Sequence, residues 1–453
     1  MVFAPYCYVI NILSEVSQKI SSRTRNVLLH AALLLLMLTG TVNYFNDRLQ
    51  ELIGYESDRV RLFTTVLFIV LLIALVDRKI DARAIRVNKL FWTGWFVCFI
   101  TIFILSFVHP VKAYYLLWCI LSLTVFPMIM IVLNERKDTF ALSVMIARDA
   151  VIISYVFFAM NLIITPFVTK NELYFGYQGI CNNPNSNGLI CTAFFTAALF
   201  LLVVDRRDNF VCLLSITISA TLATVSGCRT AQLAMILEAI TLVIICLVHR
   251  QFHIDRSRSL RLIIALIAAV LLGIAAGKVL MTIDVFDMNA YAGTEYEETY
   301  QWVVEDETRL KINSLSSGRL FIWKAYSTKL NFLGNGSPDG ALMPEYPASK
   351  WAHNNAIDIW YASGFIAFAG YMLWLLAVII FVIKCMKKGR DYRPEYMLAA
   401  TAFIGYFVEA MLEITLYPMT NGITFLTYMT LYCAAFRREE DSTDRVNINK
   451  EGE

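Results

Sequence analysis

Long apolar runs separated by short polar segments recur along almost the whole chain. Most are about 20 residues long, which is enough for an α-helix to cross the roughly 30 Å hydrocarbon core of a membrane. These runs predict twelve transmembrane helices, at 27–45, 61–76, 90–108, 114–133, 149–168, 187–204, 209–226, 230–248, 262–281, 359–383, 397–415 and 422–436. The pattern predicts an all-α polytopic membrane protein.

Composition supports this class. Hydrophobic residues make up 58% of the 453 residues, charged residues make up 17%, and the mean hydropathy is +0.59. Soluble globular domains hold roughly a quarter charged residues, so a soluble protein is excluded. The net charge of +3 says little about partners, because the positions of Lys and Arg, and not their sum, set orientation in a membrane.

The connecting segments alternate in charge. Lys and Arg are frequent in 77–89, 134–138, 205–208, 249–261 and 384–393, and sparse in 109–112, 169–185 and 417–421. Cytoplasmic loops carry the excess of Lys and Arg, so both termini are predicted to be cytoplasmic.

One predicted connection, 282–358, is far longer than ordinary loops, and such loops are usually functional. We therefore divide the chain into helices 1–9 (1–281), a large extracytoplasmic loop with short helices (282–358), helices 10–12 (359–436) and a cytoplasmic tail (437–453). Within the loop, Ser316 can cap a short helix that carries Arg319, Trp323 and Tyr326 at helical spacing.

Three predicted helices begin at the outer face with polar residues, at 182–188, 226–230 and 353–355. Helix N-termini carry unpaired N–H groups that favour anions. Arg229 adds a fork of donors suited to phosphate oxygens, and His353 can exchange a proton near neutral pH. If the three ends meet, they form an outer-face site for a phosphorylated lipid head group.

Each of these residues also has a structural interpretation. Arg229 can extend to the membrane interface, His353 can be a packed polar residue, and Trp323 can lay the loop helix on the membrane surface. Buried acids at Glu238, Glu409 and Glu413 favour a transporter instead, because intramembrane carboxylates often mark ion or substrate paths.

Several kinds of site are missing from the sequence. No GxGxxG follows a strand, and GxxxxGK[ST] and HExxH are absent, so neither a nucleotide-binding domain nor a catalytic zinc is predicted. The ten cysteines include no CxxC pair. The sequence alone does not decide whether Cys181 and Cys228 form a disulfide. No cofactor is expected.

Four segments resemble motifs of one family in matching order: CNNPNSNGL (181–189), SGCRTAQL (226–233), SGRLFIWKA (317–325) and His353-Asn354 followed by nine residues and Gly364. They are similar to those of the bacterial O-antigen polymerase and O-antigen ligase superfamily, which are integral membrane glycosyltransferases. The chain departs from the family pattern in having Cys228 where a serine is usual, and Ala367 where the family often has a second glycine.

The resemblance implies an enzyme that transfers a glycan from a polyprenyl-diphosphate carrier to a sugar hydroxyl, without a metal. It implies that His353 is catalytic and that Arg229 and Arg319 bind the diphosphate. Asn183, Asn185 and Asn354 would shape the site. The implied partners are the lipid-linked oligosaccharide, the bilayer of the bacterial cytoplasmic membrane, and the flippase and chain-length regulator of the same pathway.

We therefore expect a polymerase of lipid-linked repeat units for a capsule, exopolysaccharide or O-antigen. A ligase that moves finished glycan to another acceptor is the alternative within the family. A flippase of lipid-linked oligosaccharide is the alternative from another class. The large outer loop favours the enzyme, because a flippase does not need Arg319 and His353 there.

Overall fold

A computed structural model describes most of the chain. The described residues are 2–45, 47–54, 56–109, 113–168, 179–205, 209–249, 256–283, 319–336, 352–387, 393–413, 418–419 and 422–436. Residues 284–318 of the predicted loop, including Ser316 and the acidic stretch, lie outside these residues, as do 337–351 and the tail 437–453.

The regular elements of the described chain are helices. Isolated antiparallel β-bridges pair Phe45 with Cys181 and Val87 with Phe436. The helices are α1 (Ala4–Ser17), α2 (Ser22–Val42), α3 (Asp47–Leu52), α4 (Ser57–Leu75), α5 (Lys89–Val108), α6 (Ala113–Leu123), α7 (Val125–Glu135), α8 (Thr139–Val168), α9 (Pro184–Val204), α10 (Asn209–Val225), α11 (Arg229–Val248), α12 (Arg256–Leu280), α15 (Arg319–Ser327), α16 (Asn355–Cys385), α17 (Pro394–Leu412), α18 (Gly422–Thr430) and α19 (Tyr432–Ala435). The all-α prediction is confirmed for this part of the chain.

Nine segments within the described residues are long and apolar enough to cross a membrane. They comprise α2, α5, the α6–α7 pair (Tyr115–Glu135), α8, α9, α11, α12, α16 and α17. The protein is therefore a multi-pass helical membrane protein by length and composition.

Three of the twelve predicted spans correspond to helices that fall short of this standard. α4 carries Asp58, Arg59 and Arg61 in its first turns, α10 has 17 residues, and the last predicted span is divided between α18 and α19. Helix α1 was not predicted, because its mixed sequence does not form a long apolar run.

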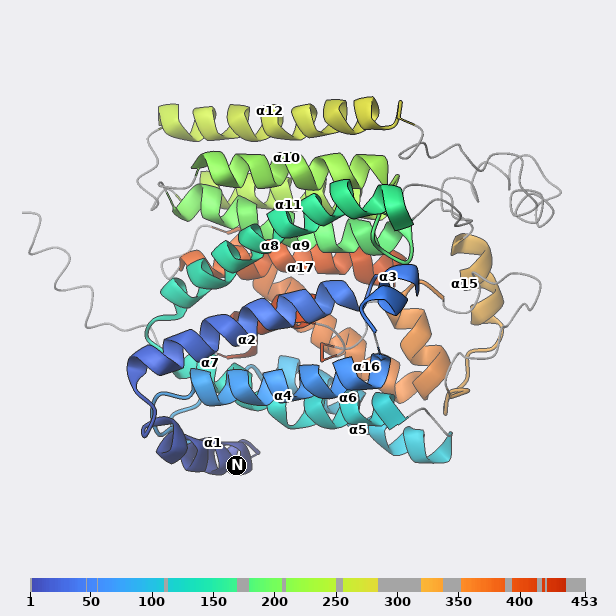
Figure 1. Cartoon of the computed structure of the whole chain (residues 1–453). Coiled ribbons are helices and arrows are strands. Elements are labelled where there is room, and N and C mark those ends of the chain that lie inside the picture. Colours follow the sequence, from blue (N-terminus) through green and yellow to red (C-terminus); the bar gives the residue numbers. More distant parts are fainter. Residues whose placement is uncertain are drawn as a thin grey trace, which may run out of the picture.

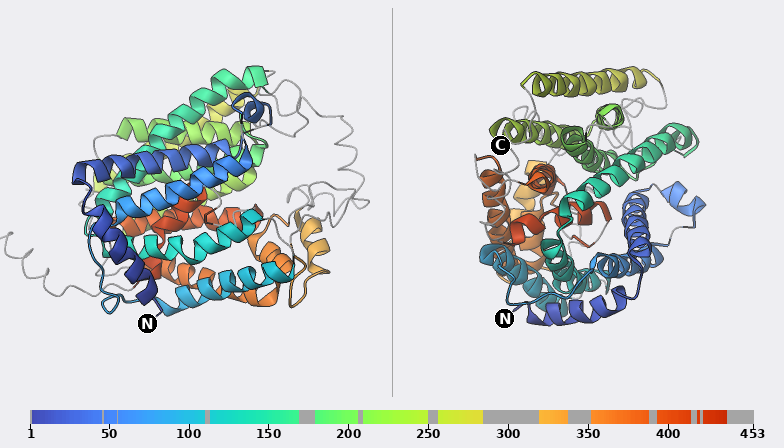
Figure 2. Two further views of the ribbon diagram at one scale, coloured as in Figure 1. Left: turned by 60° about the horizontal axis from the view of Figure 1, so that its bottom comes forward. Right: turned by 90° about the vertical axis from the view of Figure 1, so that its left-hand side faces the viewer.

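The long helices lie side by side in one bundle, and α15 lies across one end of it (Figure 1). Helix α12 packs against α10 at the edge of the bundle, as Figure 1 and the right-hand view of Figure 2 show. We call the end of the bundle that carries α15 the α15 end. Helix α1 lies at the opposite end.

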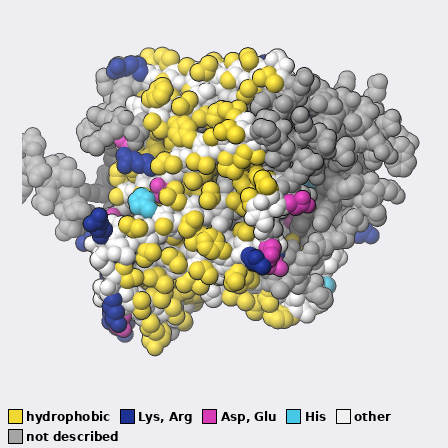
Figure 3. Space-filling model, viewed as in Figure 1, with side chains coloured by type: hydrophobic (Ala, Val, Ile, Leu, Met, Phe, Trp, Pro, Cys, Tyr) yellow, Lys and Arg dark blue, Asp and Glu magenta, His cyan; other side chains and the backbone are white. Residues whose placement is uncertain are grey.

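Hydrophobic side chains cover the middle of the face shown in Figure 3. Among the described residues on that face, Lys and Arg gather mainly towards the end opposite α15. An apolar band between charged ends is what a bilayer-spanning bundle requires.

Candidate active site

Asn354 links the beginning of α16 to the end of α17. Its Oδ1 accepts hydrogen bonds from the backbone N–H groups of Ala356 (3.0 Å) and Ile357 (3.2 Å), and its Nδ2 donates to the Met411 carbonyl (3.1 Å). Helix ends leave such N–H and C=O groups without intrahelical partners. One amide side chain therefore satisfies both helix ends and fixes their separation.

His353, directly before this cap, has a left-handed backbone with φ +50°. Such a conformation is uncommon outside glycine and persists where the surroundings enforce it. Here the Ala352 N–H donates to Asp358 Oδ1 (2.8 Å), and the Trp323 indole Nε1 donates to the Ala352 carbonyl (2.8 Å). These bonds fix the backbone before His353, and the Asn354 cap fixes it after His353.

The Glu413 carboxylate connects His353 with Arg319. Glu413 follows α17, and its side chain is 6% exposed. Its Oε2 lies 3.2 Å from His353 Nδ1, and its Oε1 accepts from Arg319 Nη2. Arg319 Nε also donates to the Leu412 carbonyl (2.6 Å). One buried carboxylate therefore joins the arginine of the predicted loop helix to the candidate catalytic histidine.

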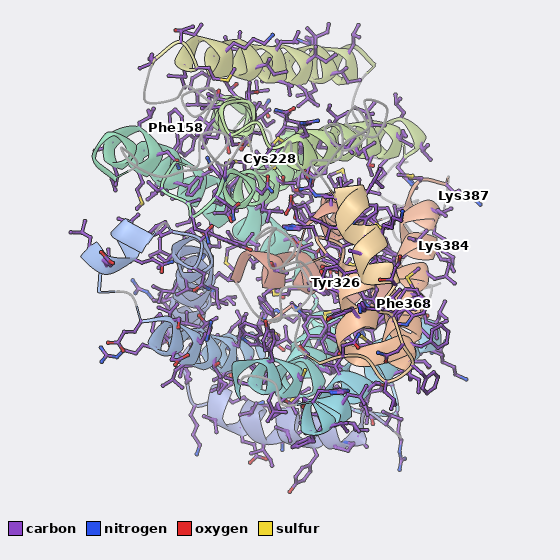
Figure 4. The ribbon with its side chains drawn as sticks, turned by 90° about the vertical axis from the view of Figure 1, so that its right-hand side faces the viewer. Phe158, Cys228, Tyr326, Phe368, Lys384 and Lys387 are labelled. Carbon is purple, nitrogen blue, oxygen red and sulfur yellow. The ribbon has the colours of Figure 1, made fainter. Side chains whose placement is uncertain are left out.

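Helix α15 carries Arg319, Trp323 and Tyr326 as the sequence predicted. Its buried side chains Ile322 and Tyr326 form a small apolar cluster with Ala352. The Tyr326 ring meets the Tyr361 ring edge-on at 4.8 Å, and burial raises the pKa of the Tyr326 hydroxyl. Figure 4 views the molecule from the α15 end and labels Tyr326 on this helix. The cluster anchors α15 to α16 and so places Arg319.

Helix α16 is broken at Gly364, where φ is 74° and ψ is −179°. The segment 331–336 binds to this break. The N–H groups of Asn335 and Gly336 donate to the carbonyls of Tyr361 (2.7 Å) and Ala362 (3.0 Å), and the Phe365 N–H donates to the Phe332 carbonyl (3.0 Å). Backbone groups freed inside a membrane must find protein partners. The part of α16 that precedes Gly364 begins just after His353 and is thus held at its far end as well.

The first turns of α9 and α11 lie against each other. Asn183 caps α9 by accepting from the Ser186 N–H (2.8 Å), and a Cβ placed on Gly188 would lie 2.6 Å from Cys228 Sγ. Cys228 is the cap residue of α11, and its thiol interacts electrostatically with Glu413 and Arg319. The three polar helix starts predicted from the sequence therefore lie at one end of the bundle.

Cys228 itself is not a reactive thiol. Burial, reinforced by the nearby Glu413 charge, raises its pKa to about 12, so it stays protonated at neutral pH. Both Cys181 and Cys228 are free cysteines, so the structure contains no bond between them.

The predicted site residues fall into two groups. His353, Asn354 and Arg319 belong to one hydrogen-bonded cluster around Glu413 and the end of α17. Asn183 and Arg229 lie at the neighbouring starts of α9 and α11, where Arg229 is exposed. Asn185 is half-buried in the first turn of α9, and no contact described for it reaches the cluster.

Sequence reasoning missed the part that Glu413 plays in this site. It grouped Glu413 with the buried acids that favour a transporter. The predicted topology already placed Glu413 at the outer end of its span, on the same side as His353, and that was the available signal.

Comparisons with known proteins do not assign a family. No protein-family model matches the chain, and the search of curated proteins found no matching sequence.

The His353 cluster is suited to moving a proton. An ionised Glu413 can only accept a hydrogen bond, so His353 Nδ1 carries the proton and Nε2 carries the lone pair. Within the described residues, no group of three or more His, Cys, Asp and Glu is arranged to hold a metal.

Proposed function

We propose that this protein is a membrane glycosyltransferase that joins polyprenyl-diphosphate-linked oligosaccharides at the α15 end, which we take as the outer face of the bacterial cytoplasmic membrane. The observation that carries the proposal is the contact of His353 Nδ1 with the buried Glu413 carboxylate, beside the helix starts at Asn183 and Arg229. This arrangement supplies a base and an anion-binding region together.

In the proposed reaction, His353 is the base and the diphosphate is the leaving group. The acceptor hydroxyl gives its proton to His353 Nε2 while its oxygen forms a bond to the anomeric carbon of the donor sugar. The bond between that carbon and the diphosphate oxygen breaks, and the diphosphate leaves with the electron pair. The proton on His353 then passes to solvent or to the departed diphosphate.

The geometry suggests different roles for the two arginines. Arg319 is held by Glu413 and the Leu412 carbonyl, so we assign it to positioning the carboxylate that orients His353. Arg229 is exposed at the N-terminus of α11, and we assign it to the diphosphate. Its planar fork and the helix N–H groups both favour phosphate oxygens.

A polymerase of repeat units is our first choice and a ligase is the second. Both perform the same transfer, so the shared motifs do not separate them. The motifs around Asn183, Arg229, Arg319 and His353 support this family assignment. The buried carboxyls Glu238 and Glu409 favour the other candidate, a flippase for the same lipid-linked sugars.

Purified protein in detergent, supplied with one lipid-linked repeat unit, tests the proposal. A ladder of products is expected. A single transfer that needs a second acceptor would identify a ligase. The absence of any transfer by folded protein, with flipping of the lipid in vesicles, would overturn the enzyme assignment in favour of transport.

A further inference from the structure

A narrow cavity of about 30 Å³ lies inside the bundle, between the outer halves of several helices. The residues that line it come from α9, α11, α17, α18 and the segment after α2. They are Tyr44, Leu189, Ile190, Thr192, Ala193, Thr196, Glu238, Ala402, Tyr406, Glu409, Ile423, Thr424 and Thr427. The cavity is therefore unusually rich in oxygen atoms for a membrane interior.

Glu238 of α11 is completely buried and faces this cavity. Its Oε1 lies 2.7 Å from the Thr196 hydroxyl, and its Oε2 is buried without a hydrogen-bond partner. The carboxyl group occupies space that α17 leaves open, because a Cβ on Gly405 would collide with Glu238 Oε1. The packing of α17 thus holds this carboxyl against the cavity wall.

Two threonines one turn apart on α9 add further oxygen atoms to the wall of the cavity. The hydroxyls of Thr192 and Thr196 donate to the carbonyls of Gly188 and Thr192, each at 3.1 Å. The Thr196 hydroxyl also donates to Glu238 Oε1 at 2.7 Å, and each hydroxyl oxygen keeps two lone pairs that can bind a cation. Thr192 also interacts with Glu409, as Thr196 does with Glu238.

The two carboxyl groups of the cavity face no positively charged side chain among the residues that line it. None of its lining residues is Lys, Arg or His, although both Glu238 and Glu409 contribute to it. Glu409 Oε1 is also buried without a hydrogen-bond partner. An uncompensated carboxylate in a low-dielectric interior is costly, so each carboxyl is neutralised either by a proton or by a bound cation.

We propose that the cavity binds one sodium ion between the Glu238 and Glu409 carboxyls and the Thr192 and Thr196 hydroxyls, with the second carboxyl protonated. All four groups offer oxygen, which hard cations prefer. Calcium takes six to eight oxygens and magnesium keeps several waters, and a cavity of about 30 Å³ accommodates neither arrangement.

The sodium site goes beyond the proposed glycosyltransferase activity. It lies one helical turn below the His353 cluster, because Glu409 and Glu413 are four residues apart on α17. Sodium binding is measurable without any lipid-linked sugar, so the site and the enzyme assignment can fail separately.

The test compares thermal unfolding of purified protein in NaCl, KCl and choline chloride at equal ionic strength. Sodium should raise the unfolding midpoint saturably, by about 2–5 °C, because it binds only the folded state. Equal midpoints in sodium and choline would overturn the proposal. An equal rise in potassium, or a full rise produced by calcium in choline chloride, would also overturn it.

Variants then locate the response. Glu238→Gln and Thr196→Val should each abolish the sodium-dependent rise, and Gly405→Ala should weaken it by displacing the carboxyl. Asp149→Asn is the matched control, since it neutralises another buried carboxyl, which pairs with His30 on a different helix. A sodium response that persists in Glu238→Gln would overturn the site. If that variant does not fold, the Thr196→Val result decides.

Discussion

His353 Nδ1 lies 3.2 Å from Glu413 Oε2, a contact between residues that are 60 positions apart in the chain. The contact joins the start of α16 to the end of α17, beside the Asn354 bond to the Met411 carbonyl. Two independent side-chain contacts therefore hold the start of α16, with His353 before it, against the end of α17. Such double support is expected where a side chain must keep one direction.

Replacing His353 by Asn should abolish transfer and preserve the fold. Asparagine tolerates the left-handed backbone that His353 adopts, so the turn before α16 is kept. Loss of a general base should lower the rate by a factor of about 10²–10⁴. The rate of product formation and the midpoint of thermal unfolding measure the two effects separately. A rate within a few-fold of wild type would return His353 to a packing role.

The pair formed by Glu413 and Arg319 can be tested by a double substitution. Glu413→Gln should destabilise the protein by about 3–5 kcal/mol, because it leaves the nearly buried Arg319 without its carboxylate. Arg319→Met in the same chain should restore much of this stability, since neither charge is then left alone. Thermal unfolding measures the recovery.

Activity should not recover in the double variant, because His353 still lacks the carboxylate that sets its tautomer. The dependence of the transfer rate on pH should also change relative to wild type. Full activity together with restored stability would show that Glu413 serves only packing.

The long helices were predictable because their apolar runs match the thickness of a bilayer, and their boundaries were not. The predicted span at 359–383 is α16, which begins four residues earlier at Asn355. The polar first turn with Asn355 and Asp358 counted against the apolar run, whereas the structure buries both side chains. Their hydrogen bonds, which hydropathy does not register, make that burial acceptable.

The residues of the candidate site were predictable from the sequence, but the contacts between them were not. Polar helix starts pointed to Asn183, Arg229 and His353 without any knowledge of distances. The contacts of Glu413 with His353 and Arg319 span 60 and 94 positions, and no local pattern encodes such separations. Pairing across the bundle had to come from the structure.

The segment between α7 and α8 should give the protein a measurable loss of stability in acid. Arg136 Nε and Nη2 donate to the two oxygens of Asp138 at 2.7 and 2.5 Å, and Arg136 Nη1 donates to the Leu75 carbonyl at 2.7 Å. Although partial burial acts in the opposite direction, Arg136 holds the pKa of Asp138 below its usual value.

A lowered pKa means that the folded state binds fewer protons than the unfolded state near this pH. The stabilisation is therefore fully present above the usual pKa of aspartate and is lost progressively as the pH falls from there through the lowered pKa of the folded state. Asp138→Asn should cost about 1 kcal/mol or less at pH 7, since Asp138 is half-exposed, and clearly less at pH 3. Equal costs at both values, from unfolding in detergent, would contradict the ion pair.

Gly364→Ala tests whether the break in α16 positions His353. Its φ of 74° and ψ of −179° fall in a region that essentially only glycine occupies, and a Cβ there would lie 2.1 Å from the Phe332 carbonyl oxygen. The substitution should therefore displace residues 331–336 from the break and cost about 3 kcal/mol or more. Gly54→Ala is the control, because Gly54 has φ +64° but open space around it, and it should cost only about 1 kcal/mol. Since the part of α16 that precedes Gly364 begins beside His353, transfer should fall in Gly364→Ala and stay unchanged in Gly54→Ala. Similar losses of stability and activity in both variants would mean that only the backbone conformation matters and that the bound segment 331–336 does not support the site.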